Sequence, residues 1–311
     1  MAIDSQAGGA AHSGGSAGIF NNPYVLLALA GLLWSGNHIA GRAVAGHVPP
    51  LFLSALRWAI GAAVIYPFAR PHLANDWRAI RAGWKPILFL TLSGGAVFSA
   101  LQYVGLQWTT ALNVSVFNSF SPVMMVAAGA AIFGDRLRAV QVAGILTSLG
   151  GVLLIVAQGD LATLMAMQFN QGDLVILFNM GLWAVYSACL RTRPPMHWTS
   201  FTVVLATVAC IVTIPFAALE LAAGRTVEIT PLTIAAVAYV STLSGILAFA
   251  FWNRGIEMIG SSRGGVFLHL IPIYGALLAT SLLGERLHLF HVFGFVLILC
   301  GVYLAVRKPG K

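Results

Sequence analysis

The chain has 311 residues, of which 59% are hydrophobic and only 8% are charged. A soluble domain has roughly a quarter of its residues charged, so this composition excludes a soluble protein and predicts an all-α polytopic membrane protein. The formal net charge of +8 requires no nucleic-acid partner, because Lys and Arg gather at the cytoplasmic ends of membrane helices and face anionic lipid there.

Low-complexity sequence precedes the first apolar run. Residues 1–22 contain "AGGAAHSGGSAG" and are predicted to form a disordered cytoplasmic tail, and no basic region or cleavage site indicates a signal peptide. From Tyr24 to Val306, apolar runs recur at about the 20-residue length that a helix needs to cross a bilayer. We therefore predict ten membrane helices, at 24–44, 50–69, 86–107, 111–133, 138–158, 172–191, 198–220, 231–252, 262–284 and 288–306.

The basic residues give an independent prediction of how these helices are oriented. Lys and Arg resist translocation, so the loops that are rich in them face the cytoplasm. Of the 17 basic residues, Arg57 falls within a predicted span and Arg42, Arg225 and Arg286 fall on one side of the membrane, which leaves 13 on the other side. We therefore expect both termini in the cytoplasm and the protein in the bacterial inner (plasma) membrane.

The sequence repeats itself with an offset of 150 residues. "FNSFSPVMMVAAGAAIFGDRL" at 117–137 and "FLHLIPIYGALLATSLLGERL" at 267–287 share Phe, Pro, Gly, Arg and Leu at equivalent positions, and the register continues to Gly151 and Gly301. Each half contains five predicted spans, an odd number, so we expect two inverted five-helix repeats. The predicted domains are the tail at 1–22, the repeats at 23–158 and 172–307, and a cytoplasmic C-terminus at 308–311.

Ten helices in two inverted halves, each with a proline in its fourth helix and Gly-acid-Arg-Leu at the end of that helix, resemble the EamA-type branch of the drug/metabolite transporter superfamily. The resemblance extends from Tyr24 to Val306 and looks closest to the YddG-type exporters of aromatic and other neutral amino acids. It implies a transporter that works by alternating access, with its substrate site at the repeat interface near the middle of the bilayer. The shared motifs specify the family well and the substrate poorly.

Polar residues in the middle of predicted spans must find a partner or face a cavity. Aromatic side chains with a few amides and hydroxyls suit a zwitterion that carries an apolar side chain. The same residue types also join helices to each other, and mid-span histidines and aromatics have structural roles, so packing is the competing interpretation. The predicted substrate-binding residues are Trp34, His38, Tyr103, Asn118, Ser121, Trp183, Ser244 and His269.

Three further features of the predicted spans carry expectations. Pro122 and Pro272 each remove a helix hydrogen bond at equivalent positions, so we predict matched hinges, with a static bend as the alternative. Arg57 lies within a span, where a charge costs about 2.5–3.5 kcal/mol. We expect it to bond to backbone carbonyls or a helix end rather than to a substrate carboxylate. Trp252 or Trp198 is expected in an interfacial aromatic belt.

All nine acidic residues fall in the tail, the loops or the helix ends. A proton-coupled exporter of the small multidrug type needs a carboxylate within the membrane, so we expect neutral or zwitterionic cargo and facilitated diffusion without ion coupling. Export of other neutral metabolites or drugs is the alternative, with His38 or His269 as the group that would titrate. No metal-ligand, nucleotide-binding or catalytic pattern is present, so we expect no metal, no cofactor and no enzymatic activity. The expected partners are the lipid bilayer and a small amino-acid substrate, and we expect a monomer.

Overall fold

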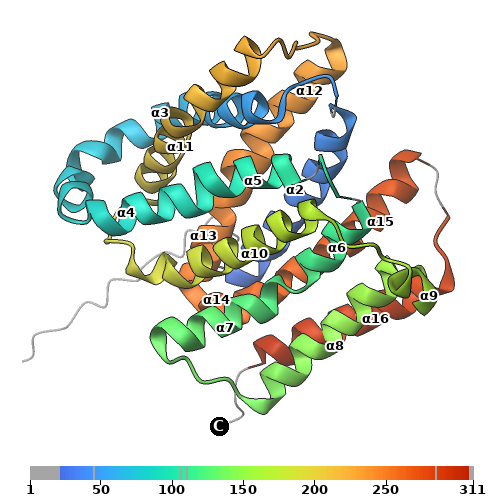
Figure 1. Ribbon diagram of the computed structural model, residues 1–311. Coiled ribbons are helices and arrows are strands. Elements are labelled where there is room, and N and C mark those ends of the chain that lie inside the picture. The colour runs from blue at the N-terminus through green and yellow to red at the C-terminus, as the bar shows by residue number, and fades with distance from the viewer. Residues whose placement is uncertain (1–21, 45, 106, 110, 284–285, 308–311) are drawn as a thin grey trace, which may run out of the picture.

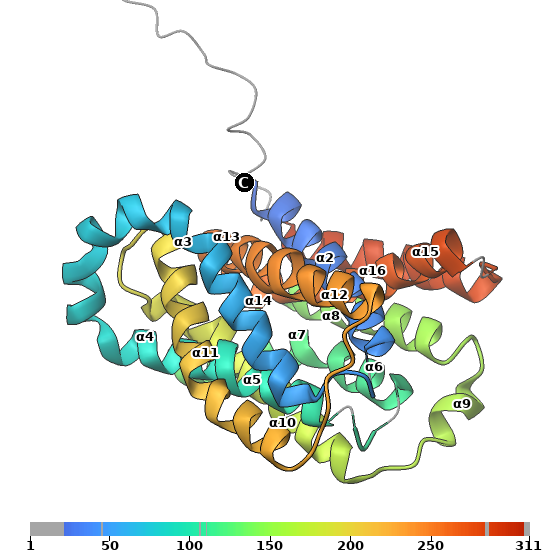
Figure 2. The same cartoon turned by 90° about the horizontal axis from the view of Figure 1, so that it is seen from above.

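The structure is a computed structural model, and all regular secondary structure in the part of the chain that it describes is helical, in agreement with the predicted all-α fold class (Figure 1). The helices form one bundle when seen from the side and from above (Figures 1 and 2). The predicted tail, apart from residue 22, and the predicted C-terminus at 308–311 lie outside the described residues. The structure describes residues 22–44, 46–105, 107–109, 111–283 and 286–307.

Prolines, glycines and polar caps determine where the helices begin and end. Pro50 and Pro231 occupy the first helical positions, where a missing backbone N–H costs nothing. Gly134 ends a helix in the left-handed conformation, with φ of +69°. The first half contains α2 (Pro23–Ala43), α3 (Pro50–Ala82), α4 (Trp84–Leu90), η1 (Thr91–Val97), α5 (Phe98–Gly105), α6 (Ala111–Ser119), α7 (Ser121–Phe133) and α8 (Ala139–Val156). The second half contains α9 (Leu161–Met165), α10 (Gln171–Cys189), η2 (Leu190–Thr192), α11 (Trp198–Ala222), α12 (Pro231–Tyr239), η3 (Val240–Leu247), α13 (Ala248–Ile259), α14 (Ser261–Gly264), η4 (Gly265–His269), α15 (Leu270–Leu283) and α16 (Leu289–Val306).

Eight helical segments in the described part of the chain are long and apolar enough to cross a membrane. The other two predicted spans coincide with α2 and with the segment from α14 to α15, so the number of ten membrane helices stays a prediction. Two helical segments of the described chain are clearly longer than their predicted spans: α3 continues to Ala82, beyond residue 69, and the segment from α12 to α13 continues to Ile259, beyond residue 252. The apolar pattern marks only the part of a helix that lipid can surround, and the helix itself continues into the polar, Arg-containing segment.

The fourth predicted helix of each repeat is interrupted at the same place. Between α6 and α7 the chain makes a turn at Phe120, and Pro122 then lies in the first turn of α7. In the second repeat the 3₁₀ segment η4 precedes α15, which contains Pro272 near its start. A proline near a helix start leaves no helix hydrogen bond unmade, so both prolines begin helices rather than bend continuous ones. The predicted hinge motion at these points stays a prediction.

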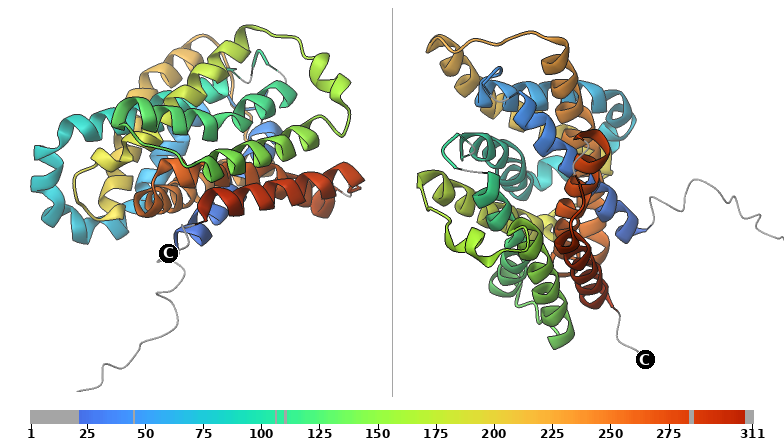
Figure 3. Two further views of the ribbon diagram at one scale, coloured as in Figure 1. Left: turned by 90° about the horizontal axis from the view of Figure 1, so that it is seen from below. Right: turned by 90° about the vertical axis from the view of Figure 1, so that its right-hand side faces the viewer.

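Equivalent helices of the two repeats pack against each other in antiparallel pairs. At the start of α3, the backbone N–H of Leu51 donates to Glu220 at the end of α11, at 2.9 Å. Toward the other end of the pair, the backbone N–H of His197 donates to Asp76, also at 2.9 Å. The second pair, α8 and α16, lies side by side in the views of Figures 1 and 3. These two pairs lie at opposite edges of the bundle, with α2, α5, α10 and α13 between them.

The pair α8 and α16 is held at close range by glycines. A Cβ atom added at Gly144 would lie 2.5 Å from the backbone nitrogen of Ala305, and one at Gly151 would lie 2.7 Å from the carbonyl oxygen of Gly294. The residue number increases along α8 from Gly144 to Gly151, while the residues that these two meet on α16 decrease in number from Ala305 to Gly294. The two helices are therefore antiparallel. Since equivalent helices run in opposite directions in both pairs, the second repeat is inverted with respect to the first.

The bundle has an aromatic interior and an apolar exterior. Its largest fully buried side chains include Trp58, Tyr186 and Trp252. Large apolar side chains also point outward from the candidate membrane segments, among them Phe178, with 64% of its surface exposed, and Phe293, with 62%. An exterior of this kind suits contact with lipid tails, because lipid imposes no cost on exposed hydrocarbon.

Candidate functional site

Two tryptophans at equivalent positions of the repeats contact each other within the bundle. The sequence "WSGNHIAGR" in α2 begins at Trp34, and "WAVYSACLR", which runs from α10 into η2, begins at Trp183, so each Trp precedes an Arg by eight residues. Their ring centroids are 5.4 Å apart, with planes at 82°, an edge-to-face arrangement. Equivalent residues touch each other only near the axis that relates the repeats, so this Trp pair marks that axis.

Further aromatic rings surround the Trp pair. Phe249 and Trp252, both from α13, have centroids 5.7 and 5.4 Å from that of Trp34. Phe98 of α5 lies 4.7 Å from Trp183. The interfacial position is wrong for Trp252, because this residue has 0% of its surface exposed and its indole N–H donates to Ser187 at 3.3 Å. The alternative, Trp198, lies at the start of α11 with 37% of its surface exposed. The apolar side chain of a bound ligand could contact these rings from several directions.

Two amide groups without complete hydrogen bonding, those of Asn37 and Asn179, lie within a helical turn of Trp34 and Trp183 along α2 and α10. Asn179, one turn before Trp183, donates to the carbonyl of Phe98 and to the side chain of Gln102, each at 3.1 Å. Among the described residues, the buried amide oxygen atoms without a hydrogen-bond partner belong to Asn37 and Asn179 and to Asn118 of α6. A buried acceptor without a donor costs free energy, so such positions favour the arrival of a ligand donor such as an ammonium group.

Arg57 joins three of the predicted site residues. One of its terminal nitrogens donates to the Tyr103 hydroxyl and the other to the Ser244 carbonyl oxygen, each at 3.3 Å. The indole N–H of Trp34 donates to the same carbonyl at 3.2 Å, so the guanidinium and the indole lie next to each other. The expected bond from Arg57 to a backbone carbonyl is therefore present. This residue was not among the predicted binding residues, although its position as a charge within a span was the signal for it.

Ser121 and His269, two other predicted site residues, make contacts between helices that do not include the Trp pair, and the structure does not describe the side chain of His38. Ser121 donates to the sulfur of Met180 at 3.1 Å and so connects α7 to α10. Both ring nitrogens of His269 are engaged, one with the Ser148 hydroxyl at 2.6 Å and one with the Ser119 carbonyl at 2.8 Å. These contacts connect η4 to α8 and α6, which fits the packing interpretation of this histidine. The side chain of His38 lies outside the described part of the structure.

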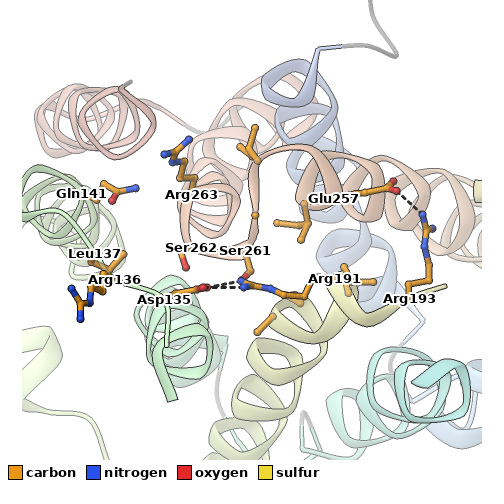
Figure 4. Close-up of a pocket in the computed structure, with 16 residues that line it drawn as sticks. Asp135, Arg136, Leu137, Gln141, Arg191, Arg193, Glu257, Ser261, Ser262 and Arg263 are labelled. Carbon is orange, nitrogen blue, oxygen red and sulfur yellow. Dashed lines mark hydrogen bonds and ion pairs between the residues drawn. The ribbon is translucent and has the colours of Figure 1, made fainter. Parts of the chain in front are cut away.

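A cavity of about 640 Å³ opens at the end of the bundle that is predicted to face the cytoplasm. In Figure 4, Asp135 and Arg191 point toward one another across it, and Arg193 pairs with Glu257 at 3.0 Å. Ser187, which accepts the hydrogen bond from Trp252, also lines the cavity. Ser187 therefore separates the cavity, which none of the described aromatic residues lines, from Trp252 and the rings around the Trp pair.

The pair of Asp135 and Arg191 connects the two repeats at the cavity mouth. The guanidinium donates to both carboxylate oxygens, one of them at 2.9 Å. This hydrogen bonding, with the positive charge of Arg191, holds the pKa of Asp135 below its usual value despite some burial. Asp135 is therefore ionised at neutral pH, and the bidentate pair is complete there.

The antiparallel pairs and the central site define a multi-pass helical membrane protein of the two-repeat transporter class. The chain belongs to the EamA-like transporter family, whose profile matches residues 21–157 and 170–307. The predicted family is thus confirmed, and closeness to its YddG-type branch stays a prediction.

Individual relatives match the chain along nearly its whole length. The uncharacterized transporter YyaM of Bacillus subtilis (strain 168) is 26% identical, over 93% of this chain and 95% of its own. A protein of Salmonella typhimurium named "Probable amino-acid metabolite efflux pump" is also 26% identical, over 88% of this chain and 91% of its own. A crystal structure of a protein 24% identical matches with a TM-score of 0.73, over 91% of this chain and 96% of that one. The last similarity supports the fold alone.

Proposed function

We propose that this membrane transporter exports aromatic and other neutral amino acids by alternating access, without obligatory ion coupling. The observation that carries the proposal is the contact between Trp34 and Trp183 at the axis between two inverted repeats. Rings around this pair suit an apolar side chain, and the unpartnered amide oxygens suit an ammonium group. The printed name of the Salmonella relative, an amino-acid metabolite efflux pump, supports the same substrate class.

The proposed mechanism follows from the symmetry of the repeats. Exchanging the conformations of the two halves would turn a cavity at one end into a cavity at the other, while the Trp pair remains on the axis. Pro122 and Pro272, at the matched interruptions of the fourth helices, are the proposed hinges. In this proposal both termini and Asp135 lie in the cytoplasm and Glu285 lies outside.

A labelling experiment tests the orientation. Single cysteines replace Asp135 or Glu285 in a chain whose three native cysteines are changed to serine, and a membrane-impermeant thiol reagent is added to either face. We expect the two positions to react from opposite faces of the membrane. Reaction of both from the same face would contradict inverted insertion.

Flux measurements test the substrate and the coupling. Purified protein in sealed liposomes is loaded with unlabelled tryptophan, and counterflow of labelled tryptophan is measured with a panel of competing amino acids. We expect competition by aromatic and other neutral amino acids and flux that persists when an ionophore removes the pH gradient. Loss of flux without the gradient would favour the proton-coupled alternative, and competition only by other metabolites or drugs would exclude amino-acid export.

Single alanine variants test the site itself. The proposed binding residues are Trp34, His38, Tyr103, Asn118, Trp183 and Ser244, with Ser121 and His269 proposed to support the same region through packing. Normal counterflow in the Trp34, Asn118 and His269 variants together would refute this placement of the site. Arg78, an exposed residue of α3, provides the matched control substitution, which we expect to leave flux unchanged.

A further inference from the structure

Arg57 is a buried charge that pairs with no carboxylate among the residues that the structure describes. Only 5% of its surface is exposed, and its Nε atom has no hydrogen-bond partner. Its guanidinium is also positioned over the Trp58 and Phe249 rings, at 5.3 and 5.7 Å from their centroids. Ring faces and neutral acceptors stabilise a cation only partly, so the site as it stands favours the entry of an anion.

The carboxylates in the described part of the chain are engaged elsewhere. Each has a partner at a helix end or in a loop, and none of them forms an ion pair with Arg57. Asp135 pairs with Arg191, and Glu257 pairs with Arg193 and Arg254. Asp76 accepts from the His197 backbone, and Asp160 accepts from the Ala162 backbone. Asp173 accepts from Thr109 and Asn113. Glu220 accepts from the backbone at the start of α3, and Glu228 bonds to His47.

The inverted repeat supplies an internal comparison that weakens a purely structural role for Arg57. The segment "YPFA" in α3 matches "IPFA" in α11 with an offset of 148, which makes Leu205 the counterpart of Arg57. A Cβ at Gly245 in η3 would lie 3.3 Å from the Arg57 side chain, and one at Gly95 in η1 would lie 3.2 Å from Leu205. The same helix contact is therefore made by leucine in one half and arginine in the other, so the packing itself does not require a charge.

The surroundings of Arg57 are rich in hydrogen-bond donors that lack partners. The indole N–H of Trp58 is buried without an acceptor, as are the hydroxyls of Ser54, Ser241 and Ser244. Ser54 lies one turn before Arg57 on α3, and the two other serines lie on η3, which packs against α3. A positive charge with several free donors around it has the chemistry of an anion site. The π-helical form of η3, a form often found at functional sites, accords with this assignment.

We infer that Arg57 binds the carboxylate of the transported substrate, with the Ser244 carbonyl holding its guanidinium when no substrate is present. This inference rests on the proposed function and deepens it, because it assigns the two ends of the substrate to different groups. The carboxylate contacts Arg57, and the apolar side chain contacts Trp34, whose indole shares the Ser244 carbonyl with Arg57. The substrate class is therefore a carboxylate attached to an apolar or aromatic group.

The experiment compares ligands that differ by one charged group. Ligand-induced thermal stabilisation of purified protein is titrated with tryptophan, with tryptamine, which lacks the carboxylate, and with indole-3-propionate, which lacks the ammonium group. The variants are Arg57→Leu, which copies the other repeat, Arg57→Lys, which keeps the charge, and Arg78→Leu, which removes an exposed charge. We expect Arg57→Leu to weaken the binding of both carboxylate ligands by about tenfold to a hundredfold while tryptamine binding is unchanged. Arg57→Lys keeps part of this affinity.

Each outcome separates this inference from the proposed function. Equal preference of wild-type protein for tryptophan and tryptamine would overturn the role of Arg57 even if Arg57→Leu did not fold. Tryptophan counterflow of normal affinity in Arg57→Leu would overturn it too, and would leave amino-acid export standing. Binding of indole-3-propionate that depends on Arg57, without counterflow of any amino acid, would support the anion site and refute the proposed function.

Discussion

Replacing Gly151 by alanine should destabilise the protein, whereas the same change at the neighbouring Gly150 should not. The added Cβ at Gly151 would lie 2.7 Å from the Gly294 carbonyl oxygen and 2.9 Å from the Ile298 backbone nitrogen, whereas at Gly150 nothing lies within 4 Å. The obstacles at Gly151 are backbone atoms of α16, so the helices must move apart. Overpacking of this kind costs about 1–3 kcal/mol. Alanine at Gly150 is neutral or stabilises the helix by up to about 1 kcal/mol.

Thermal unfolding in detergent measures this difference. A thiol-reactive dye reports unfolding through Cys189 and Cys210, which are half-buried, and the exposed Cys300 is changed to serine in all proteins. We expect Gly151→Ala to lower the Tm by several degrees, on the order of 2–10 °C, relative to Gly150→Ala. Equal Tm values for the two variants would refute the close antiparallel packing of α8 and α16.

Three other predictions concern charged and histidine side chains. The hydrogen bonds and charge of Arg191 hold the pKa of Asp135 below its ordinary value of 3.8. The pair should therefore stabilise the protein at neutral pH, and this stabilisation should be lost as the pH falls below 3.8. The unfolding curves of wild type and Asp135→Asn should then converge in acid. Burial, and to a smaller extent repulsion from His72, lowers the pKa of His197 from 6.5. The free energy of unfolding should therefore fall as the pH drops below 6.5. Unfolding measured between about pH 7 and 5 should show a less steep fall for His197→Asn. His269→Ala removes two buried hydrogen bonds and should cost about 1–3 kcal/mol in thermal unfolding; an unchanged Tm would contradict the packing role.

Much of the helical organisation can be predicted from the sequence, because membrane helices are long, apolar and separated by polar loops. The offset of 150 residues indicated the repeat, and the antiparallel packing of α8 with α16 bears out the inversion. The continuation of α3 to Ala82 could not be predicted from hydropathy, since a helix outside lipid needs no apolar run. The π-helical forms of η1 and η3 also depend on packing between helices rather than on local composition.

The site was harder to predict than the fold. Which polar residues face one another depends on how each helix is rotated about its own axis, and the sequence does not give that rotation. Trp34 and Trp183 do meet, but sequence spacing alone does not show that equivalent residues lie on the symmetry axis. His269 shows the opposite difficulty, since a polar residue in the middle of a span can be fully satisfied by neighbouring helices. The position of Arg57 within a span marked it as unusual. Only its hydrogen bonds to Tyr103 and to the Ser244 carbonyl, which Trp34 also donates to, place it beside the predicted residues.

If transport proceeds by the proposed alternating access, the mismatch between Arg57 and its counterpart Leu205 has a consequence for the transporter without substrate. A carrier with two identical halves would rest equally in both orientations, because exchanging the halves would leave its energy unchanged. A cation without a counterpart in the other half makes the free energies of the two orientations unequal. A difference of about 1.4 kcal/mol would already give a tenfold preference for one of them. A single side chain can thus determine which face of the membrane meets an unloaded carrier first, while gradients still determine where the cargo accumulates.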